Sequence, residues 1–371
     1  MNRTLLGGLS APAFLRRHWQ KTPLLVRNAL PGFAGVLDLD DMIRLAGRDD
    51  CESRLVMRNG RSWTVEHGPF PSSRLRRLPL RNWTLLVQGV DLFLPQAREL
   101  LSQFRFIPYS RLDDLMVSYA PDGGGVGPHF DSYDVFLLQG PGRRRWQVSR
   151  QRDLTLREDS PLKILERFRP QGEAVLEPGD MLYLPPHFAH DGTAVGDCYT
   201  YSIGFRAPSH RELACEFLMF LEERLRLPGR YADPELLPQE HPAEIGTAMI
   251  RKIGKALRGI RWSGRDTVDF LGSYLTEPKQ QVRFAPPSPA LASAAFVRAA
   301  RRSGVHLSAG SQMLYSGTRL FINGETADAA PAALRQLADD RRLAGRRFPR
   351  DGATAELLYQ WYRAGYISIN A

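Results

Sequence analysis

The chain contains few cysteines and no long apolar run. Its 371 residues include only Cys51, Cys198 and Cys215, which lie far apart and form no CxxC pair. This spacing argues against a disulfide framework or a structural zinc site and suits a reducing cytoplasm. Because no run of about eighteen apolar residues occurs, we expect no membrane helix. The apolar start is interrupted by Gly, Ser, Pro and then Arg16 and Arg17, so we expect no export signal.

The composition is that of a basic, globular protein. Hydrophobic residues make up 43% of the chain and charged residues 24%, which is enough for a sizeable core in two or three domains. The net charge of +10 suits a nucleic acid or nucleoprotein partner. An arginine-rich solvated surface explains the charge equally well, since no Lys/Arg block is longer than three residues.

Three regions with different patterns follow one another, which predicts an α+β protein. Residues 1–207 hold a helical preface and then short apolar runs with turn signals between them, typical of a β-sandwich or barrel. Residues 208–280 read as helices, because Ser209 and Glu212 form a capping-box pattern before helically spaced apolar residues. Residues 281–371 alternate helices with a β-ribbon, as winged-helix units do, and such units bind either DNA or proteins.

A histidine and an aspartate two positions apart point to a metal. On a strand, His129 and Asp131 would face the same side, so both can reach one ion. Completed by a second imidazole, they would form the facial triad of non-haem Fe(II) oxygenases. The alternative is an ordinary surface pair.

The second imidazole is expected from "LEPGDMLYLPPHFAHDG", residues 176–192, which offers His187 and His190. In this string a PGD turn is followed by an apolar strand and by Pro-Pro. Together they fix the position of the chain that follows. One histidine is then presented to the metal while the other points away. The residue pattern favours His190, beyond the Pro-Pro kink, and the alternative for either is a rim histidine that holds a turn.

Three consecutive arginines follow the Gly140–Gly142 turn. Strand alternation places Arg144 on the buried face with Trp146 and Val148, while Arg143 and Arg145 face water. A buried guanidinium needs an anionic partner, because an unpaired buried charge is costly. That partner is either a structural acidic side chain or a dicarboxylate ligand, whose carboxylate matches the guanidinium fork.

The run "CYTYSIGF", residues 198–205, alternates small and bulky side chains. The small face would line a cavity and the bulky face would pack against another layer. Thr200 and Ser202 would then offer hydroxyl groups to a ligand. Ser118, on a small face of "LMVSYA", is a further candidate for the same pocket.

These motifs resemble a known family. The strings "GGGVGPHFDSYDVFLLQGPGRRRWQV", "EPGDMLYLPPHFAHDG" and "YSIGFRAP" are similar to JmjC-type, 2-oxoglutarate-dependent oxygenases, and specifically to bacterial ribosomal oxygenases. The opening segment "FLRRHWQKTPLLVRNALPGF" resembles the same family, and the likeness is strongest over residues 10–210. The resemblance implies hydroxylation of an arginine in the large-subunit ribosomal protein L-sixteen.

The resemblance also implies an architecture and a set of site residues. The architecture is a double-stranded β-helix (cupin/JmjC) catalytic domain over 1–207, a helical dimerisation region over 208–280 and a winged-helix-like domain over 281–371, assembled as a homodimer. It implies Fe(II), 2-oxoglutarate as cosubstrate, and dioxygen. By position, the iron ligands are His129, Asp131 and His190, the cosubstrate carboxylate anchor is Arg144, and Ser118 and Ser202 provide polar contacts to the cosubstrate.

Three alternatives stay open from the sequence. The target side chain could be a histidine of another protein, because a single sequence does not display pocket shape. A metal-dependent isomerase or other cupin enzyme would need no 2-oxoglutarate, but it leaves Arg144 without a task. A ligand sensor with a DNA-binding winged helix suits the basic charge, but Asp339 and Asp340 in the candidate recognition region would repel phosphate. We therefore expect no specific DNA binding.

Overall fold

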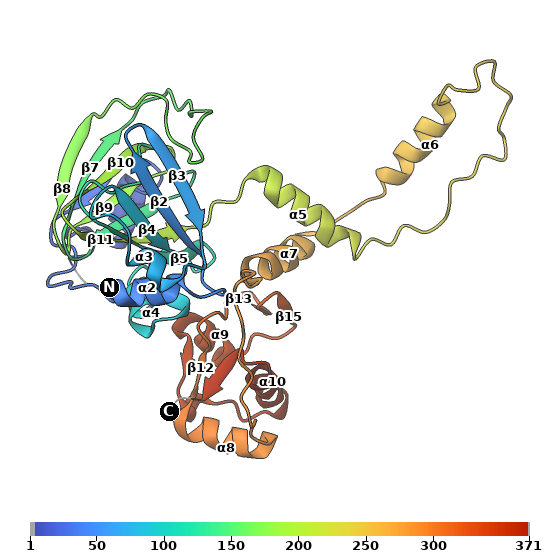
Figure 1. The fold of residues 1–371 in the computed structure, drawn as a ribbon. Coiled ribbons are helices and arrows are strands. Elements are labelled where there is room, and N and C mark those ends of the chain that lie inside the picture. Colours follow the sequence, from blue (N-terminus) through green and yellow to red (C-terminus); the bar gives the residue numbers. More distant parts are fainter. Residues whose placement is uncertain (1–3, 370–371) are drawn as a thin grey trace.

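The computed structural model describes residues 4–369, and its N-terminal region is built on two antiparallel sheets (Figure 1). The larger sheet has eight strands in the order β1-β9-β6-β11-β5-β4-β2-β3, and the smaller has three in the order β10-β7-β8. The strands of the larger sheet, in chain order, are β1 (Leu24–Val26), β2 (Ser53–Asn59), β3 (Ser62–His67), β4 (Trp83–Val87), β5 (Leu112–Ala120), β6 (Val135–Gln139), β9 (Met181–Leu184) and β11 (Cys198–Phe205). The strands of the smaller sheet are β7 (Arg143–Ser149), β8 (Gly172–Leu176) and β10 (Ala189–Val195).

The two sheets face each other across an apolar layer. One buried cluster combines Val135 and Leu137 of β6 and Leu182 of β9 with Trp146 of β7 and Leu176 of β8. Side chains alternate across each strand, so the opposite face of the larger sheet packs elsewhere. That face meets α1 (Ala11–Arg17), α2 (Leu39–Ala46), α3 (Ser72–Leu75), the 3-10 turn η1 (Val90–Leu92) and α4 (Pro95–Ser102). The result is a barrel-like sandwich whose interior lies between the sheets.

The strand alternation expected around Arg144 and over residues 198–205 is confirmed by β7 and β11, but the sequence did not reveal β10. Its run "AHDGTAV" contains Asp191 and Gly192, and both residue types are depleted in strands. The ring of Trp146 on neighbouring β7 packs against Gly192 so closely that a Cβ there would meet it at 2.6 Å. A glycine at this point therefore reflects a tertiary contact rather than a strand propensity.

Three helices form an arm that follows the barrel. They are α5 (His210–Glu222), α6 (Thr247–Leu257) and α7 (Gly264–Thr276), and the first two extend away from the rest of the chain (Figure 1). The predicted capping box is confirmed, since Ser209 Oγ accepts a hydrogen bond from Glu212 N at 3.0 Å and Ser209 N donates to the Glu212 carboxylate. Phe217 of α5 packs edge-on against Phe270 of α7, with ring centroids 5.2 Å apart.

The C-terminal region is a separate mixed unit with its own core. It comprises α8 (Ser293–Ser303), β12 (Val305–Leu307), β13 (Met313–Ser316), β14 (Arg319–Ile322), β15 (Glu325–Ala327), α9 (Ala332–Asp340), β16 (Arg342–Leu343), η2 (Gly345–Arg347), α10 (Gly352–Arg363) and β17 (Ile367–Ile369). Two small sheets, β16-β12-β17 and β13-β14-β15, pack with the helices. The predicted α+β class is confirmed, whereas the boundaries at 207 and 280 stay predictions.

Contacts connect this unit to the barrel. Lys279, just after α7, donates to Asp113 of β5 at 2.8 Å, and the hydroxyl of Tyr109 donates to the backbone carbonyl of Asp339 at 3.3 Å. Every helix in the part of the chain that the structure describes is too short or too polar to span a bilayer.

Candidate metal centre

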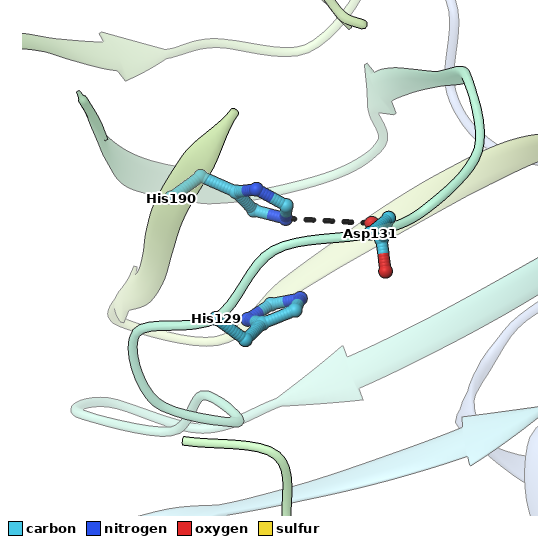
Figure 2. Close-up of side chains that lie close together, drawn as sticks. All are labelled: His129, Asp131 and His190. Carbon is cyan, nitrogen blue, oxygen red and sulfur yellow. Dashed lines mark ion pairs between the residues drawn. The ribbon is translucent and has the colours of Figure 1, made fainter. Parts of the chain in front are cut away.

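Three potential ligands converge at one end of the barrel interior. The ligand atoms of His129, Asp131 and His190 all lie within 4.8 Å of one another. Figure 2 shows both imidazole rings and the carboxylate turned toward a common point, with His190 Nε2 3.7 Å from Asp131 Oδ2. Two histidines and one carboxylate on one side of an ion leave its other positions open, which is the donor set of a 2-His-1-carboxylate site.

Backbone pairing brings these residues together from distant parts of the chain. His129 and His190 exchange two backbone hydrogen bonds of 2.9 and 2.8 Å, so they form a bridged antiparallel pair. The glycine-rich segment before His129 runs beside β10, and a Cβ on Gly125 would meet the Gly192 carbonyl oxygen at 2.5 Å. The glycines therefore allow this segment to approach β10 closely enough for the pair to form.

The second nitrogen of each imidazole is oriented by the backbone. His129 Nδ1 lies 2.8 Å from the carbonyl oxygen of Gly127, and His190 Nδ1 lies 2.9 Å from that of Phe188. A nitrogen facing a carbonyl must carry a proton, so in the neutral imidazole the lone pair is on Nε2. Burial, reinforced by the neighbouring His129, lowers the pKa of His190 to about 4. His190 is therefore neutral near pH 7, which is the form that ligates metals.

His187 is the histidine that points away from the cluster. Its side chain is exposed, while His190 is 2% exposed and belongs to the cluster. The backbone of His187 has a positive φ of 64°, and its N–H donates to the Asp131 carbonyl oxygen at 2.8 Å. His187 thus holds the turn beside Asp131 through its backbone, as the sequence allowed for one of the two histidines.

Arg144 enters the barrel interior, as strand alternation predicted. It is 4% exposed, whereas Arg143 and Arg145 face water. Its Nε and Nη2 atoms are buried without a hydrogen-bond partner, and no acidic side chain among residues 4–369 forms an ion pair with it. The nearby Trp146 Nε1 is also buried and unpartnered. A structural acidic partner, one of the two explanations open from the sequence, is therefore absent from the described residues.

Hydroxyl groups line the opposite wall between Arg144 and the ligand cluster. Strand register pairs Thr200 with Ser118 and Ser202 with Met116, all on the inner face of the larger sheet. Thr200 is 1% exposed and its hydroxyl has no hydrogen-bond partner in the described chain, while Ser118 and Ser202 are 4% and 8% exposed. All three hydroxyl residues are therefore buried on the inner face, and Thr200, whose hydroxyl is unpartnered, is the strongest candidate for a ligand contact.

An acidic side chain that the sequence did not indicate lies farther along the same inner face. Asp114 shares the inner face with Ser118 and Met116 by strand alternation. Its carboxylate lies near Gly204 of β11 and accepts hydrogen bonds from Gln88 Nε2 and Gly89 N. Burial raises the pKa of Asp114 to about 6, against the lowering effect of Lys279 at 3.8 Å. The sequence pattern gives no reason to choose Asp114 over its neighbour Asp113. Only the strand register shows that Asp114 is the one that faces the interior.

Tyr133 is a second residue that sequence reasoning missed. Desolvation of its hydroxyl and the charge of the nearby Asp131 carboxylate raise the pKa of Tyr133, and the charge of Asp114 adds to the effect. The charges of both Asp131 and Asp114 therefore act on the Tyr133 hydroxyl. The sequence feature that could have indicated Tyr133 as a site residue is its position two residues after Asp131, in "HFDSY".

The fold and the cluster agree with comparisons to known proteins. The JmjC domain family matches residues 99–213, and the ROXA-like winged helix family matches residues 259–368. Facing antiparallel sheets that hold a His-Asp-His cluster place the chain in the JmjC class of proteins. Within that class, the chain belongs to the bacterial ribosomal oxygenases, the family that includes the uL16 3-hydroxylase.

Relatives from several organisms support this assignment. The ribosomal protein uL16 3-hydroxylase of Escherichia coli K12 is 35% identical over 345 residues, covering 92% of this chain and 91% of that protein. A probable ribosomal oxygenase of Haemophilus influenzae is 43% identical over 201 residues, covering 53% and 49% of the two chains. Human ribosomal oxygenase 1 is 31% identical over 205 residues, covering 50% of this chain and 31% of that protein.

Solved structures show the same arrangement along the whole chain. The crystal structure of E. coli YcfD has a TM-score of 0.88 at 33% identity and covers 98% of both chains. The structure of YcfD in complex with cobalt and 2-oxoglutarate has a TM-score of 0.85 at 33% identity, covering 98% of this chain and 99% of that one.

The geometry predicts different effects for the two histidines on metal binding. We expect His190→Ala to weaken binding of Mn(II) by more than about 100-fold. Removing a side chain that binds the metal should lower the affinity more than removing a residue that only supports such a side chain. His187→Ala is the matched control and should bind Mn(II) within about twofold of wild type, since only its backbone contacts the site. Isothermal titration calorimetry measures both, with circular dichroism to check folding. Equal loss in the two variants would contradict this placement.

Proposed function

We propose that the chain is an Fe(II)- and 2-oxoglutarate-dependent hydroxylase of an arginine side chain in ribosomal protein uL16, the L-sixteen protein, and that it acts in the cytoplasm. The observation that carries the proposal is Arg144, a buried guanidinium with no acidic partner among residues 4–369, on the wall of the barrel that also bears the His-Asp-His cluster. The similarity to the E. coli uL16 3-hydroxylase over most of both chains supports the choice of substrate.

The donor set fits a ferrous ion. His129, Asp131 and His190 would hold it, through two neutral imidazoles and one carboxylate. When bound, the metal and 2-oxoglutarate supply the oxidising chemistry that activates dioxygen, which the side chains of the protein lack. The structural relative bound cobalt and 2-oxoglutarate, which agrees with this donor set.

The interior also fits a dicarboxylate. Arg144 pairs with Ala194, four residues along β10 from His190, a separation of roughly 13 Å at 3.3 Å per residue. The Arg144 side chain points into this space, so a short dicarboxylate could reach from the guanidinium to the metal. An uncompensated buried charge costs several kcal/mol, and a ligand carboxylate would remove that cost.

Thr200, Ser118 and Ser202 would complete the contacts of this ligand. The unpartnered Thr200 hydroxyl can donate to the same carboxylate as Arg144, while Ser118 lies opposite Thr200 on β5. Beyond them, Ala120, Ala194 and Cys198 form a small apolar cluster that closes this end of the barrel. These side chains orient the cosubstrate and exclude water from its far end.

Acidic groups at the open end suit an arginine target. Asp114 lies on the inner face of β5, and the charges of Asp114 and Asp131 both act on the Tyr133 hydroxyl. A guanidinium entering from this end would meet the Asp114 carboxylate, and a charge-assisted hydrogen bond of that kind is roughly twice as strong as a neutral one. This arrangement favours arginine over histidine as the target residue.

An intact-mass assay tests the function directly. Purified uL16 is incubated with the enzyme, Fe(II), ascorbate and oxygen, with and without 2-oxoglutarate. We expect a gain of one oxygen atom only when 2-oxoglutarate is present, and fragment ions should locate it on an arginine. Oxygen on a histidine would overturn the arginine target, and no gain together with uncoupled succinate formation would overturn uL16 as the substrate.

Arg144 should govern cosubstrate binding. We expect Arg144→Ala to raise the KM for 2-oxoglutarate by about 100-fold or more, because a buried charge pair loses one partner. Arg145→Ala, one position along β7 but facing water, should leave this KM unchanged. The measurement is succinate formation against 2-oxoglutarate concentration. If both variants keep the wild-type KM, Arg144 is not the anchor.

Asp114 should govern binding of the substrate arginine. We expect Asp114→Asn to raise the KM for a uL16 fragment by roughly 10-fold or more while the KM for 2-oxoglutarate stays unchanged, since it removes a charge-assisted hydrogen bond. Asp113→Asn is the control, because that neighbouring carboxylate lies on the other face of β5. An unchanged fragment KM in Asp114→Asn would exclude this contact.

The same contact should depend on pH. The form of Asp114 that binds a guanidinium is the carboxylate, which forms as pH rises through a pKa of about 6. The KM for the fragment should therefore fall between about pH 5 and 7 in the wild type. Asp114→Asn should lack this component of the pH profile, and an identical profile in both proteins would contradict the assignment.

We also propose that the helical arm forms a homodimer. More than half of the large exposed hydrophobic side chains lie between residues 218 and 262, and α6 has no buried residue at all. Leu218 on α5, Ile250 on α6 and Trp262 are each about three-fifths exposed. Apolar surface of this extent is unusual on a monomer, and a second copy that presents the same arm would cover it.

The dimer proposal predicts a change in molecular mass. We expect wild-type protein to sediment as a dimer and the double variant Ile250→Asp/Ile253→Asp to sediment as a monomer, because charges would replace the apolar face of α6. Leu80→Asp, at a side chain that is 89% exposed and distant from the arm, is the control and should stay dimeric. A monomeric wild type at micromolar concentration would overturn the proposal.

A further inference from the structure

A concentration of positive charge lies on the C-terminal unit, away from the candidate active site. Residues 281–371 carry twelve arginines and six acidic side chains, a net charge of +6 in a region without lysine. Ten of these arginines are exposed, and six of the ten lie on α8 and on the segment that begins at η2. We call them the α8–η2 patch: Arg298, Arg301, Arg302, Arg346, Arg347 and Arg350.

Packing between the two segments brings the six arginines together. Gly345 at the start of η2 lies so close to the end of α8 that a Cβ there would meet the Arg301 carbonyl oxygen at 2.4 Å. Phe348, between the η2 arginines and Arg350, packs against Phe296 of α8 with ring centroids 6.0 Å apart. Segments nearly fifty residues apart in sequence are thus held side by side, with their arginines exposed around the contact.

The patch has no internal counter-charge. None of its six guanidinium groups forms an ion pair with an acid anywhere in residues 4–369, although ion pairs neutralise many arginines elsewhere. Arg347 donates to the amide oxygen of Gln336 at 2.8 Å, and the neighbouring acids Asp351 and Asp340 have other partners. Asp351 caps α10 by accepting from Thr354 N, and Asp340 accepts from Gln336.

The patch is also open to a large partner. The helix α8 lies at the end of the molecule opposite the barrel (Figure 1), and Arg298, Arg301 and Arg302 on it are exposed among the described residues. The acidic Asp339, in contrast, contacts Tyr109 of the barrel region and Tyr315 of β13. Asp339 therefore faces the barrel side of the unit, whereas the six unpaired arginines lie around α8 and η2.

From this distribution we infer that the α8–η2 patch binds the phosphate backbone of RNA. Several unpaired arginines on one exposed face suit a polyanion with closely spaced charges, and guanidinium groups bind phosphate oxygens with two hydrogen bonds. RNA is the polyanion chosen because the proposed substrate is a ribosomal protein, so this inference rests on the proposed function. The patch lies outside α9, so it needs no recognition helix and reads no base sequence.

Fluorescence anisotropy with a labelled, mixed-sequence RNA tests the inference on the full-length protein. The RNA should be longer than the roughly 16 nucleotides that a single-strand site covers. We expect binding that weakens steeply between about 50 and 200 mM salt, as phosphate contacts require. The triple variant Arg301→Gln/Arg302→Gln/Arg346→Gln should bind at least about 10-fold more weakly, with a log–log salt slope shallower by about 2.

The matched control removes the same charge elsewhere. Arg16, Arg17 and Arg77 are exposed and form no ion pair within the described residues, so Arg16→Gln/Arg17→Gln/Arg77→Gln should keep wild-type RNA affinity and slope. Three results would overturn the inference: no RNA binding by the wild type at low salt, equal weakening in both triple variants, or patch-dependent binding of anionic phosphatidylglycerol vesicles without binding of RNA.

Activity measurements separate this inference from the proposed function. The patch variant should hydroxylate isolated uL16 at the wild-type rate, because its substitutions lie outside the barrel. Loss of RNA binding with normal hydroxylation supports both proposals. Wild-type enzyme that binds RNA through the patch but does not hydroxylate uL16 would overturn the proposed function alone.

Discussion

Two backbone hydrogen bonds between His129 and His190 are the interaction on which the rest of the site depends. They join a glycine-rich segment to a strand more than sixty residues later and bring both imidazoles to one point. Asp131 is held by a third backbone bond, from His187. The cluster is therefore determined by main-chain pairing, and side chains alone would not assemble it. The glycines near positions 125 and 192 are needed because the chains pass so closely there.

Strand alternation then orders the chemistry along the barrel. Arg144 lies toward the closed end, Thr200 and Ser118 come next, the His-Asp-His cluster follows, and Asp114 lies toward the open end. These groups share the interior because alternate side chains of a strand share a face. A cosubstrate and a protein side chain can thus approach the metal from opposite ends. Burial of Arg144 without an acidic partner makes the closed end selective for an anion.

The sequence predicted part of this arrangement and missed the rest. The alternation around Trp146 predicted an inward Arg144, and the small face of residues 198–205 predicted a cavity wall, because strand periodicity is a local property. The strand β10 was not foreseen, since Gly192 is explained by a Trp146 ring that arrives from another strand. Asp114 and Tyr133 were missed for a related reason. The roles of Asp114 and Tyr133 depend on where they lie relative to the ligand cluster in the folded barrel, and the local sequence pattern does not contain that information.

The sequence by itself determined the α+β class, the candidate ligands and the inward arginine, because each follows from spacing within one strand or from a motif. Only the tertiary structure decided between His187 and His190, since their environments differ in the pairing partner and hardly at all in local sequence. It alone showed that Arg144 has no acidic partner in the described chain, and that two separated arginine groups form one patch. Pairing and burial are properties of the folded chain, because they depend on residues distant in sequence.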